Sequence, residues 1–157
     1  MTRQLIPMKL PVSGETIMVI PVSMASETML TRRQFPAPKP PAVVVSYDGE
    51  KRTERNAADP NYLKAYQLYE NELQIEVTER ILRAIALKQT LTEDQKTAVK
   101  ELREALDGLE DLPKNDKILW FFKEAIGADA DIKAIVRKSA QLADPQEEAI
   151  ATEIAGF

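Results

Sequence analysis

The sequence predicts an α+β protein: a small N-terminal β-hairpin and strand module with a short helix, then a predominantly α-helical bundle. First, seven of the ten prolines lie within the first 41 residues, which excludes a long helix there. Second, apolar side chains recur at steps of three or four from residue 60 onward. We therefore expect two domains, a β-containing module with a proline-rich joint at 1–59 and a helical domain at 60–157.

The N-terminal module begins with a predicted β-hairpin. Apolar segments at 8–10 and 17–20 flank Ser13-Gly14-Glu15, in which the glycine supplies the positive φ of a tight turn. Pro21 ends the second strand, and Ser23 can cap a short helix over 24–34.

A proline-rich joint follows this helix. Residues 35–41 contain four prolines and favour a polyproline II spacer. The β-branched run at 43–47 predicts a strand, with Asp48-Gly49 as the turn behind it. Residues 50–58 are polar and carry both charges, so we expect them to lie on the surface or to be mobile.

A long helix is predicted from Asp59-Pro60, because Asp caps the free N–H groups and proline fits the first helical position. One apolar stripe runs along it for up to about 30 residues. Its members are Tyr62, Tyr66, Tyr69, Leu73, Val77, Ile81, Ile85 and Lys88. Such a stripe must face another part of the protein or a partner.

Further helices are expected wherever a polar capping residue precedes an apolar pattern. These starts are Thr92 with Gln95 as a capping box, Asn115, Asp129 or Asp131, and Asp144 before Pro145. The helix after Thr92 should end near Gly108, and the helix after Asn115 near Gly127.

The composition excludes most familiar enzyme chemistry. The chain has no Cys and no His, and therefore lacks thiolate sites, a Cys nucleophile and the commonest general base. Its five glycines are isolated, so no phosphate-binding loop is present. We expect no enzymatic activity, no cofactor and no metal.

Charge and hydropathy also limit the classes of partner that we expect. The formal charge is −4, which disfavours nucleic acid and anionic lipid as partners. No apolar run approaches the ~20 residues that span a bilayer, and the first residues lack the pattern of a signal peptide. A basic cluster at Arg32-Arg33, Lys51-Arg52 and Arg55 is better explained as a solvated surface.

Two apolar features are the candidate partner-binding residues. Residues 118–122 read Ile-Leu-Trp-Phe-Phe and cover every side of a helix, so Leu119, Trp120, Phe121 and Phe122 are either buried in the domain or contact a second molecule. The edge formed by Tyr62, Tyr66 and Tyr69 suits a core boundary and an interface equally. The acidic residues Asp107, Glu110 and Asp111 lack the spacing of a calcium loop and are interpreted as a solvated turn.

The order of these elements resembles the tail assembly chaperones of long-tailed bacteriophages over about residues 8–85. The resemblance rests on the hairpin Leu10-Pro11-Val12-Ser13-Gly14-Glu15, the helix end Arg32-Arg33-Gln34-Phe35-Pro36, the strand and turn Val43-Val44-Val45 and Asp48-Gly49-Glu50, and the helix start Asn56-Ala57-Ala58-Asp59-Pro60-Asn61-Tyr62. The part from Thr92 onward has no counterpart in it.

The resemblance implies a non-enzymatic protein that binds the tape measure protein and tail tube subunits in the host cytoplasm during phage assembly. A homo-oligomer is compatible with that role. One alternative is a structural virion protein, such as a minor tail, neck or head-tail joining component with an extended proline-rich arm. A small carboxylate-dependent enzyme is the alternative from another class.

Overall fold

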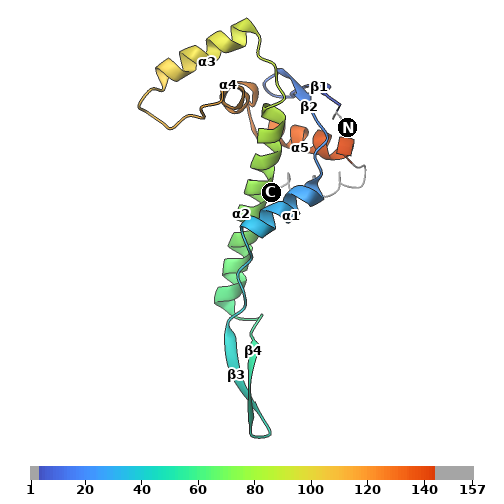
Figure 1. Cartoon of the computed structure of the whole chain (residues 1–157), viewed down its shortest axis with the longest axis vertical. Helices are drawn as coiled ribbons and strands as arrows, with labels where there is room; N and C mark the ends of the chain where they lie inside the picture. Colours follow the sequence, from blue (N-terminus) through green and yellow to red (C-terminus); the bar gives the residue numbers. More distant parts are fainter. Residues whose placement is uncertain (1–3, 144–157) are drawn as a thin grey trace. The chain divides into compact units, whose positions relative to one another are not determined.

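A computed structural model describes residues 4–143 of the chain, and it confirms the α+β class (Figure 1). It contains two separate antiparallel hairpins and a set of helices. The described residues fall into two compact units, which we treat separately. Unit 1 comprises the chain up to Glu27 together with the chain from Thr78, and unit 2 comprises Thr28–Val77.

The first hairpin belongs to unit 1 and lies where the sequence predicts it. Strands β1 (Ile6–Lys9) and β2 (Thr16–Val19) pair with Met8 opposite Ile17. Gly14 has a φ of 75°, and its N–H donates to the carbonyl of Leu10 at 3.1 Å. The turn therefore uses the left-handed backbone region that glycine enters without strain.

Helix α1 (Met24–Gln34) has the predicted bounds, and Ser23 caps it through a hydrogen bond from Ser26 N to its hydroxyl at 3.2 Å. Helix α2 (Pro60–Ala86) also begins as predicted, because the Asp59 carboxylate accepts from Tyr62 N at 2.9 Å. Both helices contribute residues to both units.

The second hairpin belongs to unit 2 and corrects the interpretation of residues 50–58. Strand β3 (Ala42–Tyr47) was expected, but the polar segment after the turn forms strand β4 (Glu50–Arg55) along its whole length. Asp48 and Gly49 have φ values of 50° and 82°, a two-residue turn whose twist suits a hairpin. Pairing imposed by this turn, not apolar patterning, makes β4 a strand, although its side chains are exposed as expected.

The remaining helices belong to unit 1. Thr92 and Gln95 form the predicted capping box of α3 (Glu93–Ala105), and Asn115 caps α4 (Asp116–Trp120). Helix α4 continues into one π-helical turn, η1 (Phe121–Ala125), and α5 (Asp129–Ala143) follows. The helix predicted after Asp144 lies outside the described residues.

The core of unit 1 brings together side chains from both ends of the chain. Apolar residues from β2, from the last turns of α2 and from the helices that follow are buried; they include Ile17, Val19, Ile81, Ile85, Val99, Leu119, Phe121, Ile135 and Val136. The predicted stripe of α2 thus divides: Ile81 and Ile85 lie in unit 1, and Leu73 and Val77 are buried in unit 2. The two units divide within α1 and within α2, so residues 59 and 60 both lie inside unit 2. The expected domains at 1–59 and 60–157 stay a prediction.

Candidate functional site

The apolar segment at 118–122 lies mainly in the core of unit 1. Leu119 and Phe121 have no exposed surface and Trp120 has 3%, whereas Phe122 is half-buried. The rings of Phe121 and Phe122 meet edge to face, with centroids 5.8 Å apart. A partner can reach Leu119, Trp120 and Phe121 only if unit 1 opens, so these three side chains are not part of the surface of unit 1.

The tyrosine edge lies on α2 in unit 2 and is half-buried. Neighbouring rings are in contact, with centroids 5.9 Å apart between Tyr62 and Tyr66 and 6.0 Å apart between Tyr66 and Tyr69. The Tyr69 hydroxyl donates to the carbonyl of Phe35 at 2.7 Å. This hydrogen bond connects the residue after α1 to α2. It therefore fixes the position of the backbone at Phe35, where the proline-rich joint begins.

An ion pair supports the same contact. The guanidinium of Arg32 lies 3.3 Å and 3.5 Å from the two carboxylate oxygens of Glu70. Burial lowers the pKa of Arg32, but the Glu70 carboxylate and a hydrogen bond with Tyr66 raise it more, so the side chain is always charged. Part of the predicted basic cluster is therefore neutralised inside unit 2.

Beside Tyr69, unit 2 has a surface pocket of about 180 Å³ that we call the Phe35 pocket. Its lining combines apolar side chains with two glutamates; the lining residues are Phe35, Tyr69, Glu72, Leu73, Ile75 and Glu76. Phe35 is 48% exposed and Ile75 is 56% exposed, so two large apolar side chains of the pocket lining are open to solvent; exposed apolar side chains that lie together mark binding surfaces. This is the strongest candidate binding site in the described part of the chain.

The exposed apolar surface continues along α2. Leu68 is 56% exposed and precedes Ile75 by about two helical turns, so both lie on the same side of the helix. Glu72 lies between them on that side. The sequence analysis missed Phe35, Leu68 and Ile75; the apolar repeat of Leu68 and Ile75 on the polar side of α2 was the signal that could have revealed two of them.

The two glutamates of the pocket lining have no partner within the described residues. Within residues 4–143, Glu72 and Glu76 form no ion pair and no side-chain hydrogen bond. A ligand that enters the Phe35 pocket therefore meets both apolar side chains and two carboxylates that have no partner within the described residues. Such a site favours an apolar side chain flanked by Lys or Arg.

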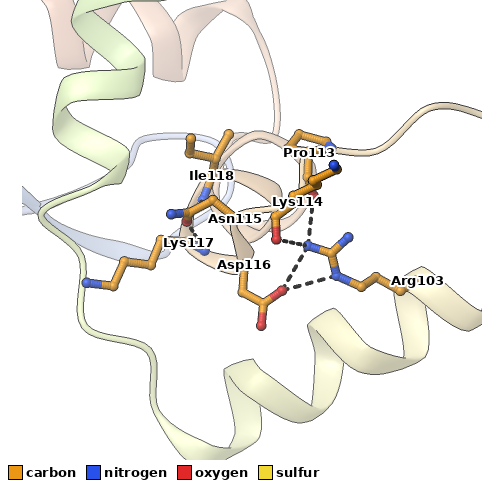
Figure 2. Close-up of polar contacts among 7 residues, drawn as sticks. All are labelled: Arg103, Pro113, Lys114, Asn115, Asp116, Lys117 and Ile118. Carbon is orange, nitrogen blue, oxygen red and sulfur yellow. Dashed lines mark hydrogen bonds and ion pairs between the residues drawn. The ribbon is translucent and has the colours of Figure 1, made fainter.

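The acidic turn after α3 is a structural connection. No cluster of acidic side chains that could hold a metal ion occurs among the described residues. The Glu110 carboxylate accepts from Lys123 Nζ at 2.9 Å. Figure 2 shows how Arg103 holds the end of the turn: its Nη2 donates to Asp116 at 2.8 Å and to the carbonyls of Pro113 at 2.7 Å and Lys114 at 3.1 Å.

The one buried carboxylate among the described residues belongs to Asp131, and it is structural too. It accepts from the backbone N–H groups of Val12 at 2.8 Å, Ser13 at 3.2 Å and Gly127 at 2.8 Å. Burial by itself raises the pKa of Asp131, but these donors outweigh it and hold the pKa below its ordinary 3.8. The carboxylate is ionised and fully engaged, so it is not available as a general acid or base.

Comparison with known proteins adds no relative: no protein-family model matches the chain, and neither a curated protein nor a solved structure is significantly similar to it. In the part of the chain that the structure describes, no helix is both long enough and apolar enough to cross a membrane.

Proposed function

We propose that this chain is a non-enzymatic polypeptide-binding protein that acts as a tail assembly chaperone of a long-tailed bacteriophage and shields helices of the tape measure protein. The observation that carries the proposal is the Phe35 pocket, with its exposed apolar side chains and its two glutamates. An apolar surface of this kind on a helix is a common docking site for an amphipathic helix.

The spacing on α2 favours a helix as the ligand. Leu68 and Ile75 repeat at about two turns, which matches the apolar repeat of a second helix packed alongside. Glu72 and Glu76 select for basic residues next to the apolar anchors. Long helices of a tape measure protein would supply such repeats many times over.

The resemblance to tail assembly chaperones supports the same role. The elements on which it rests are all formed: the first hairpin, α1, the proline-rich joint, β3 with its turn, and α2. The aromatic residue before the joint, Phe35, lines the pocket. The joint therefore connects directly to the proposed binding surface.

The test is co-expression with the tape measure protein and capture through a tag on this chain. We expect the native chain to retain the tape measure protein and Ile75→Lys to lose it, because an ammonium group then replaces an apolar side chain of the pocket lining. Leu109→Lys is the matched control, since Leu109 is 76% exposed and lies in the acidic turn of unit 1. Equal capture by all three chains would refute the assignment of the Phe35 pocket.

The second candidate is a structural virion protein with an extended arm. The exposed β3–β4 hairpin behind the proline-rich joint favours it, because such a hairpin can lie along a neighbouring subunit. Mass spectrometry of purified virions separates the two roles. A chaperone is absent from the particle, whereas a structural component is retained at a fixed copy number.

A further inference from the structure

The β3–β4 hairpin buries very little of its own surface. Of its strand residues only Val45 is half-buried, and all the others are exposed. Val44 is 70% exposed, Tyr47 49% and Val43 38%. An isolated two-stranded hairpin is at best marginally stable in water. Because its valines are exposed, this hairpin gains little stability from the burial of its own side chains.

The register shows which backbone groups of β3 lack a partner. In a hairpin with a two-residue turn, the residues that flank the turn exchange both hydrogen bonds, and the exchange recurs at every second pair. The register and the bond from Asn56 N to the Pro41 carbonyl at 2.9 Å follow this alternation. The N–H and C=O groups of Ala42, Val44 and Ser46 consequently point away from β4.

The two edges of the hairpin differ in charge. The outward positions of β3 are Ala42, Val44 and Ser46, all uncharged. The outward positions of β4 are their direct cross-strand partners, Arg55, Thr53 and Lys51. Charged edge residues, lysine above all, protect an edge from pairing, so β4 is protected and β3 is not.

We propose that β3 pairs antiparallel with β3 of a second copy of this chain, about a two-fold axis at Val44. In this register Val44 faces its own copy, and Ala42 faces Ser46 of the second copy. Val43 likewise faces Val45 of the second copy. Every cross-strand pair is uncharged, and each outward backbone group of β3 gains a partner.

The alternative pairing through β4 places charged side chains directly opposite one another. If β4 paired with its own copy about Thr53, Lys51 would lie opposite Arg55 of the second copy twice over, and Arg52 would lie opposite Glu54 twice over. The like-charge pairs destabilise a sheet and offset the opposite-charge pairs, whereas pairing through β3 opposes only uncharged side chains. Pairing with a second copy also joins two hairpins into one four-stranded sheet. A sheet of three or more strands can be stable in water, whereas an isolated hairpin is marginal.

The pairing joins the face of β3 that carries three of its larger apolar side chains to the same face of the second copy. Val43, Val45 and Tyr47 lie on the same side of β3, opposite Glu54, Arg52 and Glu50 of β4. The guanidinium of Arg52 lies 5.3 Å from the centre of the Tyr47 ring. Two copies together bring both sets of valines and tyrosines onto one continuous sheet. This inference is independent of the Phe35 pocket and of the proposed chaperone role.

Sedimentation analysis of the full chain over a dilution series tests the proposal. We expect a dimer of the 17.6 kDa chain that dissociates to the monomer mass in Val44→Lys, because two ammonium groups then meet on the axis. Thr53→Lys is the matched control: it adds the same charge on the same face, but at the β4 edge, and it should remain dimeric.

A mixing experiment identifies the occupant as a second copy. Val44→Lys and Val44→Glu should each be monomeric, and an equimolar mixture should restore the dimer through opposite charges on the axis. A native chain that is monomeric at every concentration would overturn the proposal. The β3 edge would then be assigned to pairing with a strand of another protein. A dimer that survives Val44→Lys, or that Thr53→Lys disrupts equally, would overturn it as well.

A disulfide cross-linking test remains decisive if the charged variants fail to form the hairpin. The chain has no cysteine, so Val44→Cys introduces a single thiol. Directly opposed residues of a hydrogen-bonded antiparallel pair have Cα atoms about 5.5 Å apart, within disulfide range. Oxidation should yield a covalent dimer from Val44→Cys and none from Thr53→Cys; failure of Val44→Cys to cross-link faster than Thr53→Cys would refute the register.

Discussion

Replacing Asp131 tests whether one carboxylate holds the two ends of unit 1 together. Its oxygens accept from Val12 N, Ser13 N and Gly127 N, and the first of these bonds joins residues 119 positions apart in the chain. Asp131→Asn keeps the volume of the side chain. It replaces one accepting oxygen with an NH₂ group that must point at a backbone N–H donor.

The magnitude follows from the hydrogen bonds lost. A hydrogen bond to a charged group contributes about 1.5–3 kcal/mol, and an unsatisfied buried donor costs a similar amount. Val12 is 56% exposed, so water can replace its bond in part. We therefore expect Asp131→Asn to lower the free energy of unfolding by about 2–3 kcal/mol and Asp131→Ala by about 3–4 kcal/mol.

Urea unfolding followed by tryptophan fluorescence is the assay. The chain has one tryptophan, Trp120, which is buried in unit 1 and reports directly on its unfolding. Because the folded-state pKa of Asp131 is lowered, its contribution is fully present above the ordinary value near 3.8 and is lost as the pH falls through the folded-state pKa. The gap between native and Asp131→Asn should thus be largest near neutrality and shrink below about pH 4.

Two outcomes would refute this reasoning. One is an Asp131→Asn chain that unfolds at the same urea concentration as the native chain at pH 7. The other is a gap between the two that widens as the pH falls, since a group with a lowered pKa cannot gain stabilising effect on protonation.

Four further variants test the core and the connections of unit 1. Phe121→Ala should lower the free energy of unfolding by about 3–5 kcal/mol and the half-buried Phe122→Ala by clearly less; equal losses in urea unfolding would contradict the burial. Gln89→Leu should lose about 1–3 kcal/mol, because its amide accepts from Met18 N at 2.9 Å and donates to the Met18 carbonyl at 2.7 Å; faster amide exchange in β2 would show it, and unchanged exchange would contradict it. Arg103→Met should cost about 1–2 kcal/mol in thermal unfolding, and an unchanged melting temperature would show that the turn needs no anchor.

Part of the site was visible in the sequence. The tyrosine edge was identified from helical spacing, and the structure places Tyr69 in the lining of the Phe35 pocket. Phe35 itself was read only as part of the joint, because its role depends on where α1 ends relative to α2 within unit 2. For residues 118–122, periodicity could not distinguish a buried helix from a docking helix, and the observed burial of Phe121 decides for the core.

The sequence by itself determined the local structure. The N-terminal ends of α2, α3 and α4 follow from Asp59, Thr92 and Asn115, because an N-cap satisfies backbone N–H groups only two or three residues away. Strand β4 likewise follows from a local feature, the Asp48-Gly49 turn that pairs it with β3. The tertiary structure alone decided the Asp131 contacts and the division of the α2 stripe between two units. These depend on segments that meet after long stretches of intervening chain, and no short-range pattern specifies such a meeting.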